Sequence, residues 1–349
     1  MLRKTLLALF AFLSLPAGAA PCAGFTDVDT SSPFCANVAW MKSRAITLGC
    51  TATLYCPNDA VSRLAMAAFL NRLGDVLLPP NVVWVAPAGG QFQSIQGAID
   101  YVYTNGKTPA VIQVAPGTYP ELVTLRPYVR LQGSGKQLTR IQPTGCATAN
   151  ASAVTMAGAA QLQDVTIETS CENGVLFFSP PAVLAYYGDS AVQDVDIVIN
   201  LPGTSGIRIT GNISAVGPIE RVRMYLESAP NYGIFVDASS GLLRMSATDI
   251  DIAIGGSPGN TGVKLDGFGI VANLARITVG PNGGANTFGL DASGATVRIR
   301  DSVLYGATAM RSVSASIQAA YVGLSSANSG AGITCAYAYN ASTLAPVVC

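Results

Sequence analysis

Histidine is absent from this sequence of 349 residues, and charged residues are scarce. Without histidine, the usual nucleophile triads are excluded and a zinc site loses a principal ligand. Lys, Arg, Asp and Glu make up 11% of the chain and their net charge is zero, so no basic surface is available for nucleic acid or anionic lipid. We therefore expect no nucleic-acid partner. A polysaccharide or cell-envelope glycan suits such a chain better.

Long apolar runs are also missing beyond the first residues of the chain. The sequence opens with Arg3 and Lys4, continues as an apolar run over 5–15 and reaches small residues at 17–19. This order is typical of a signal peptide, which we place at residues 1–19. No later segment reaches the roughly 20 apolar residues that a transmembrane helix needs. The sequence therefore predicts export to the periplasm, the cell surface or the medium, without a transmembrane segment.

Eight cysteines remain to be placed. In an exported chain they favour disulfides over metal thiolates. We expect no metal and no cofactor, with calcium required only if the protein is a lyase. Eight cysteines allow about 105 pairings, and sequence order suggests four local ones: Cys22–Cys35, Cys50–Cys56, Cys146–Cys171 and Cys335–Cys349.

Glycine and proline are abundant, at 36 and 20 residues, which is typical of many turns around buried strands. One column of similar segments has steps of 27, 29 and 27 residues and begins at Gly206, Gly233, Gly262 and Gly289. A repeat of this length, carrying several short strands, suits one coil of a β-helix. The sequence therefore predicts an all-β main domain over 83–349, a right-handed parallel β-helix of the pectin lyase-like kind, after a linker at 79–82.

A second column of segments alternates apolar and polar residues. Its apolar pairs are Val165 and Ile167, Val195 and Ile197, Val222 and Met224, Ile250 and Ile252, and Ala275 and Ile277. Successive strand residues face opposite sides, so the polar residues form two outward ladders. The first contains Asp164, Asp194, Arg221, Asp249, Leu274 and Asp301; the second contains Thr166, Asp196, Arg223, Asp251 and Arg276. Arginines between the carboxylates favour charge compensation over a catalytic or calcium site.

Both ends of the β-helix carry a predicted cap. Residues 92–103 have apolar side chains at helical spacing and predict a capping helix. Strands are expected to follow at 111–114, 122–125 and 129–131. The tail from Ala319 to Cys349 is expected to cover the last strand edge.

The segment 20–78 has a different pattern and predicts two short helices. The first is expected over Pro33–Ala45; the second is expected over Arg63–Leu73, with Ser62 as N-cap and Gly74 as its end. The segment resembles a single S-layer homology domain. The resemblance rests on Phe25-Thr26-Asp27-Val28, Val38-Ala39-Trp40, Ile46-Thr47-Leu48-Gly49, Tyr55-Cys56-Pro57, Val61-Ser62-Arg63 and Met66-Ala67-Ala68-Phe69-Leu70.

In the S-layer homology family, tandem copies bind cell-wall polysaccharide through a Thr-Arg-Ala-Glu-like motif. Only the arginine of that motif is present here, as Arg63. The resemblance implies that Arg63 and Trp40 contact a glycan. The alternative is a solvated arginine in the first helical turn and a tryptophan in the core.

The start of the main domain is similar to the N-terminal part of pectin methylesterases. The matching segments are Phe92-Gln93-Ser94-Ile95-Gln96-Gly97-Ala98-Ile99, Val114-Ala115-Pro116-Gly117-Thr118-Tyr119-Pro120-Glu121, Val129-Arg130-Leu131-Gln132-Gly133 and Thr139-Arg140-Ile141. The resemblance implies the fold, because enzymes and non-enzymes share these elements. The catalytic Gln-Asp-Thr, Asp-Phe-x-Phe-Gly and Arg-Pro-Trp segments of those esterases are missing, as is the histidine that polygalacturonases require.

Weak candidates for a site remain. A lyase needs calcium carboxylates and an arginine or lysine base, for which Asp194, Asp196, Arg221 and Arg223 are available. Tyr186 and Tyr187 are candidates for a sugar-stacking platform, with edge coverage as the alternative.

Together these features favour a non-catalytic bacterial β-helix protein in adhesion or envelope-glycan binding. The first alternative is a polysaccharide-active enzyme, pectate lyase-like or pectin esterase-like. The second is a structural spacer of the cell envelope.

Overall fold

A computed structural model describes residues 20–77, 81–146, 151–180, 182–227, 230–238, 242–255, 259–280 and 288–347. The segment assigned to a signal peptide, residues 1–19, lies outside these ranges. The chain divides into two compact units, Met1–Pro79 and Pro80–Cys349. The division falls close to the expected linker at 79–82, although the first strand of the second unit already begins at Val82.

The first unit has two helices and a small antiparallel sheet: β1 (Pro21–Cys22), β2 (Phe25–Asp29), α1 (Cys35–Ser43) and α2 (Arg63–Leu77). Ser62 caps α2, since its Oγ accepts a hydrogen bond from the Ala65 N–H at 3.0 Å. The helix does not end at Gly74 as expected and continues to Leu77. One glycine costs a helix only about 1 kcal/mol, so it does not by itself terminate a helix.

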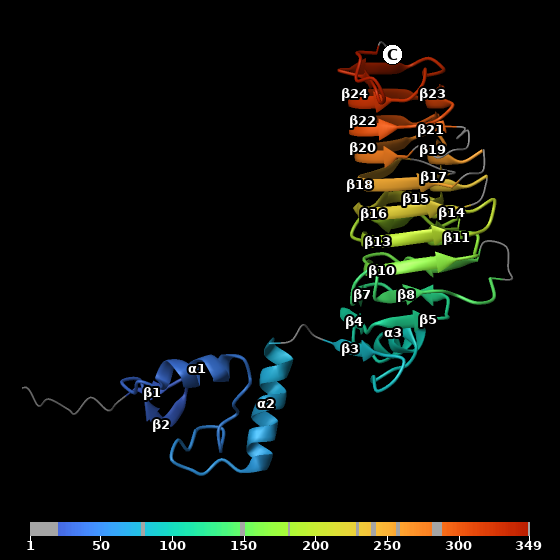
Figure 1. Cartoon of the computed structure of the whole chain (residues 1–349). Helices are drawn as coiled ribbons and strands as arrows, with labels where there is room; N and C mark the ends of the chain where they lie inside the picture. The colour runs from blue at the N-terminus through green and yellow to red at the C-terminus, as the bar shows by residue number, and fades with distance from the viewer. Residues whose placement is uncertain are drawn as a thin grey trace, which may run out of the picture. The chain divides into compact units, whose positions relative to one another are not determined.

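In the second unit, strands of successive coils pair in parallel, and Figure 1 shows them stacked in chain order. This arrangement is a parallel β-helix, as the sequence repeat predicted. The long sheet consists of β3 (Val82–Val85), β4 (Ala110–Val114), β7 (Val129–Gly133), β10 (Gln161–Thr169), β13 (Ala191–Ile199), β16 (Ile219–Leu226), β18 (Leu243–Ile254), β20 (Ile270–Val279), β22 (Thr296–Leu304), β24 (Ser316–Leu324) and β25 (Ile333–Ala336).

Shorter strands complete the coils. Five of them pair with members of the long sheet or with one another: β5 (Gly117–Tyr119), β8 (Thr139–Ile141), β12 (Ala185–Tyr187), β15 (Ile213–Val216) and β26 (Tyr339–Asn340). A second parallel sheet contains β6 (Val123–Thr124), β9 (Ser152–Thr155), β11 (Asn173–Ser179), β14 (Ser205–Gly211), β17 (Tyr232–Ala238), β19 (Thr261–Asp266), β21 (Phe288–Ser293) and β23 (Thr308–Val313).

The glycine column that marked the repeat lies in the second sheet. Gly206, Gly233, Gly262 and Gly289 occupy corresponding positions of β14, β17, β19 and β21. A Cβ atom on Gly206 would lie 2.7 Å from the carbonyl oxygen of Gly233, and one on Gly262 would lie 2.7 Å from that of Gly289. Close stacking of the coils therefore explains why the sequence carries glycine at this position.

Helix α3 (Ile95–Thr104) covers the first coils. Its apolar side chains Ile95, Ala98, Ile99 and Val102 are fully buried, as the helical spacing predicted. The Glu121 carboxylate accepts hydrogen bonds from the N–H groups of Ile95 at 2.7 Å and Gln96 at 2.9 Å. An acidic side chain thus satisfies free N–H groups at the start of the helix.

In the long sheet, each of the strands β10, β13, β16, β18, β20, β22 and β24 turns a corner at one residue with a positive φ, and the last coil does so directly after β25. The corner residues are Asp164, Asp194, Arg221, Asp249, Arg276, Asp301, Tyr321 and Tyr337, with φ between 52° and 59°. Strand register aligns them coil by coil. We refer to this set as the corner column. Left-handed backbone is uncommon outside glycine, although aspartate tolerates it better than most residues.

The corner column corrects the predicted ladders at β20. Ile250 pairs with Ile277, not with Ala275, so the strand is shifted by two residues from the expected alignment. Arg276 therefore belongs to the first ladder, beside Asp249, and Leu274 is a buried residue. Because Ala275 is apolar, its place in the sequence pattern indicated a residue that faces the core. It instead precedes the corner residue Arg276 and pairs with Thr248.

The C-terminal cap starts later than expected. Residues 316–324 form β24, which pairs in register with β22, so the stack extends beyond Ala319. Disulfides join Cys22 to Cys35, Cys50 to Cys56 and Cys146 to Cys171. These are three of the four expected pairs. The fourth, Cys335–Cys349, includes a residue outside the described ranges.

Candidate functional site

In the first part of the corner column, from Asp194 to Arg276, the charged side chains of neighbouring coils form ion pairs. Arg221 donates from Nε to both carboxylate oxygens of Asp194 at 3.0 Å and from Nη2 to Oδ2 at 2.8 Å. Arg276 donates from Nη2 to Asp249 Oδ2 at 2.8 Å. The hydrogen bond from Arg221 lowers the pKa of Asp194, and the same contact raises the pKa of Arg221.

The neighbouring ladder is paired in the same way. Asp196 Oδ1 lies 3.1 Å from Lys136 Nζ. Arg223 donates to the Tyr225 hydroxyl at 3.3 Å and lies 3.7 Å from the Asp251 carboxylate. The hydrogen bond to Tyr225 raises the pKa of Arg223.

These contacts bear on the four candidate catalytic residues, Asp194, Asp196, Arg221 and Arg223. The structure brings them together on β13 and β16, but each already has an ionic partner. A general base needs a pKa near the working pH. The pKa values of both arginines are instead raised further above neutrality. The geometry therefore favours charge compensation between coils.

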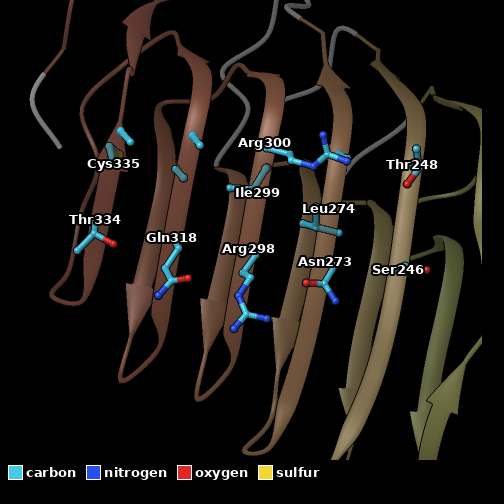
Figure 2. Close-up of a pocket in the computed structure, with 14 residues that line it drawn as sticks. Ser246, Thr248, Asn273, Leu274, Arg298, Ile299, Arg300, Gln318, Thr334 and Cys335 are labelled. Carbon is cyan, nitrogen blue, oxygen red and sulfur yellow. The ribbon is translucent and has the colours of Figure 1, made fainter.

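A groove of about 570 Å³ lies beside the second half of the corner column. Figure 2 shows its polar side chains on successive strands of the long sheet. It is lined by residues of β18, β20, β22, β24 and β25: Ser246, Thr248, Asn273, Leu274, Ala275, Arg298, Ile299, Arg300, Gln318, Ala319, Ala320, Thr334, Cys335 and Ala336. We call it the corner groove.

A row of polar side chains follows the corner groove across five strands. Strand register places them directly opposite one another, in the order Ser246, Asn273, Arg298, Gln318 and Thr334. Adjacent strands are about 4.8 Å apart. The row therefore offers a hydrogen-bonding group at each strand spacing along the axis of the β-helix.

Small residues in a parallel row explain the hollow. In the earlier coils this row contains Gln193 and Glu220, which fill the surface and hydrogen bond to each other at 3.0 Å. In the groove the same row contains Ala275, Arg300, Ala320 and Ala336, so three of its four residues are alanine. Because alanine has no side chain beyond Cβ, space remains above these strands.

Two tyrosines end the corner column next to the groove. Tyr321 and Tyr337 directly follow the lining residues Ala320 and Ala336 in the sequence. Their rings stack with centroids 5.0 Å apart and an interplanar angle of 10°, and the residues are 55% and 74% exposed. The sequence analysis missed this pair. Their signal was the continuation of the corner column into the last two coils.

The structure separates the predicted platform of Tyr186 and Tyr187. Tyr186 is 59% exposed, whereas Tyr187 is 7% exposed and packs edge-on against Phe177, with ring centroids 5.5 Å apart. The Tyr187 hydroxyl donates to the Phe178 carbonyl at 2.7 Å. Tyr187 is thus a core residue, and only Tyr186 offers a ring to solvent.

In the first unit, Trp40 is 41% exposed and is therefore not a core anchor. Its indole lies under the Arg44 guanidinium, 4.6 Å from the ring centroid. It lines a groove of about 310 Å³ with Met41, Ile46, Tyr55, Met66, Phe69, Leu70 and Leu73. Arg63 is an exposed residue at the start of α2 and does not belong to this lining.

The outer face of the second sheet is closed by side-chain contacts. Arg208 lies between Glu172 at 3.3 Å and Asp237 at 2.8 Å. Arg311 pairs with Asp291 at 2.5 Å, and its guanidinium lies 4.1 Å from the centroid of Phe288. The cations on this face are therefore already occupied by acidic and aromatic partners.

The part of the chain that the structure describes carries neither a cluster of metal ligands nor a membrane-spanning helix. There, no three His, Cys, Asp or Glu side chains gather as a set of metal ligands. Within the same residues, no helix is both long and apolar enough to cross a bilayer.

Comparisons with known proteins give distant structural likenesses alone. No protein-family model matches the chain, and no curated protein matches it. Among solved structures, it is similar to pectin methylesterase PemA from Erwinia chrysanthemi, with 13% identity and a TM-score of 0.34 over 69% of this chain and 80% of that one. It is also similar to the catalytic domain of a GH87 alpha-1,3-glucanase, with 13% identity and a TM-score of 0.27 over 76% and 65% of the two chains. At these scores the assignment of the fold rests on the strand pairing.

Proposed function

We propose that this protein is an exported, non-catalytic β-helix protein that binds a polysaccharide in the corner groove. The observation that carries this proposal is the row of polar side chains from Ser246 to Thr334, in register across five strands and beside an exposed tyrosine stack. The groove has the length and the polarity that an extended sugar chain requires, and the tyrosine stack beside it adds aromatic surface.

The chemistry of the lining supports a carbohydrate ligand. Asn273 and Gln318 each carry a donor and an acceptor, so they match the mixed character of sugar hydroxyls. Ala320 and Ala336 add apolar surface beside them, and such mixed linings are typical of ligand sites. The exposed faces of Tyr321 and Tyr337 suit the apolar side of a sugar ring.

The absence of an acid in the lining supports a non-catalytic role. Glycoside hydrolysis ordinarily needs two carboxylic acids beside the bond that is cleaved. None of the residues that line the corner groove is an aspartate or a glutamate. The nearby corner residue Asp249 is held by Arg276, and Asp301 by Arg300 at 3.0 Å.

We further propose that the first unit is an S-layer-homology-like docking module. The sequence motifs and the groove around Trp40 support this assignment. The three disulfides and the N-terminal sequence support export to the periplasm, the cell surface or the medium. The β-helix is expected to be right-handed, as nearly all parallel crossover connections are.

The test is retention of the mature protein on arrays of envelope glycans and pectic polymers, with released products assayed in the same wells. We expect retention without unsaturated products or methanol. The double variant Tyr321→Ala, Tyr337→Ala should lose retention by about thirtyfold, since stacking contributes about 1 kcal/mol per ring. Both rings are exposed, so the variant should fold.

Tyr186→Ala provides the matched control, because Tyr186 is a similarly exposed tyrosine on β12, which belongs neither to the corner column nor to the strands that line the groove. Loss of retention in this control alone would place the platform elsewhere. Release of products would contradict the non-catalytic role. Failure of every glycan to be retained would favour a structural spacer of the cell envelope.

A further inference from the structure

The corner groove is positively charged although the whole chain is neutral. Its lining contains two arginines, Arg298 and Arg300, and no carboxylate. Both arginines lie on β22, two residues apart, on the exposed side of the strand. The groove therefore differs from the ladders of the earlier coils, where arginines and carboxylates alternate.

The two arginines differ in their partners. Arg300 Nη1 donates to Asp301 Oδ2 at 3.0 Å, so its charge is compensated within the chain. Among the residues that the structure describes, Arg298 has no hydrogen-bond, ion-pair or aromatic partner. By contrast, Arg221, Arg276 and Arg311 each lie against a carboxylate of this chain.

Arg298 stands in the middle of the polar row. Asn273 lies opposite it on one side and Gln318 on the other. Neither amide can neutralise a guanidinium, but each can hydrogen bond to a neighbouring part of a ligand. The planar fork of an arginine matches the two oxygens of a carboxylate or of a sulfate ester.

We propose that Arg298 is a specificity-determining residue, which makes the corner groove select sugar chains that bear an acidic group over neutral ones. This inference rests on the proposed glycan-binding function and adds the chemical class of the ligand. The bound sugar chain lies along the β-helix axis, because the polar row runs in that direction. Four strand spacings of about 4.8 Å give the row a length of about 19 Å, which sets the stretch of chain that the groove contacts.

The test compares matched ligands and matched variants by isothermal titration calorimetry on the full mature protein at low ionic strength. The ligands are a uronic acid hexasaccharide, the same hexasaccharide with its carboxyl groups methyl-esterified, and a sulfated neutral hexasaccharide. The variants are Arg298→Gln and Arg300→Gln, which remove one charge each at exposed positions of the same strand.

We expect the wild type to bind an acidic form about tenfold more tightly than the ester, which corresponds to one charge-assisted hydrogen bond of about 1.5 kcal/mol. Arg298→Gln should abolish this preference and leave the affinity for the ester within about twofold. Arg300→Gln should keep the preference, because Asp301 already occupies that guanidinium. Whichever acidic form depends on Arg298 identifies the group as carboxylate or sulfate.

Three results would overturn the inference, and each is distinct from the others. Equal affinity for the acid and the ester, unchanged in Arg298→Gln, would refute the selectivity while leaving glycan binding in place. Binding of none of the three ligands, together with no retention on glycan arrays, would refute the proposed function and the inference with it. Equal loss of preference in both variants would show a diffuse charge effect and would also contradict a specific role for Arg298.

Discussion

The two halves of the corner column use one backbone geometry for different surfaces. In β13 and β16 the row beside the corner holds Gln193 and Glu220, whose side chains fill the space. In β20 to β25 the row beside the corner is mostly alanine, and the column ends in two stacked tyrosines. The comparison shows that the β-helix backbone alone does not create the groove. The size of the side chains in the row beside the corner decides whether a groove forms.

Ionic partners follow the same division. In the first half, each arginine of the ladders has a carboxylate within 4 Å. In the second half, Arg300 is paired but Arg298 is not, and the polar row beside it consists of amides and hydroxyls. The first half thus holds the coils in register, whereas the second half presents an arginine without an ionic partner and a row of amides and hydroxyls.

Filling the groove should remove the difference between the two halves of the corner column. Ala320→Gln places in the second half the kind of side chain that Gln193 provides in the first. We expect glycan affinity to fall more than tenfold, because the added side chain occupies the space between the polar row and the tyrosines. Calorimetry with a glycan that the wild type retains on the arrays measures the loss.

Thr278→Gln is the control for this change, since Thr278 is exposed on β20 but does not line the groove. It should bind as the wild type does. Both variants should keep the wild-type urea midpoint of unfolding. Unchanged affinity in Ala320→Gln would show that the hollow is not used by the ligand.

A smaller effect is expected from the ion pairs of the first half. The pKa of Asp194 is lowered by its hydrogen bond with Arg221, so the pair stabilises the fold above the ordinary pKa of 3.8, and this contribution is lost as the pH falls through the lowered value. The Asp194 side chain is 37% exposed, which limits the contribution to less than about 1 kcal/mol.

Urea unfolding between pH 7 and pH 2 measures this contribution. Asp194→Asn should be slightly less stable than the wild type at pH 7 and equal to it at pH 2. Asp189→Asn, at an exposed carboxylate with no ion pair among the described residues, should follow the wild type throughout. A difference between Asp194→Asn and the wild type that persists at pH 2 would contradict an ionic origin.

The sequence predicted the β-helix because its repeat has a direct physical cause. Coils stack so closely that glycine recurs at one position, and apolar residues recur where strands face the core. The same regularity predicted the capping helix α3 and its four buried residues. The sequence was sufficient to predict the structure wherever the same position in each coil has the same surroundings, such as the core or the neighbouring backbone.

The site escaped prediction because it lies where the repeat shortens. Tyr321 follows Asp301 by 20 residues and precedes Tyr337 by 16, whereas earlier corner residues are 25 to 30 apart. The last coils therefore fell outside the expected period and were assigned to a cap. The adjacent Tyr186 and Tyr187 were predicted to form a sugar-stacking platform together. Neighbours along a strand face opposite sides, however, so one of them is buried.

Chemical nitration of tyrosines, read by mass spectrometry with and without glycan, tests the corner groove most directly. Tyr186, Tyr321 and Tyr337 are all exposed, so all three should be modified in the free protein. We expect a saturating glycan to protect Tyr321 and Tyr337 while Tyr186 reacts as before. Protection of Tyr186 alone, or no protection of Tyr321 and Tyr337 by a glycan that binds, would contradict a binding site in the corner groove.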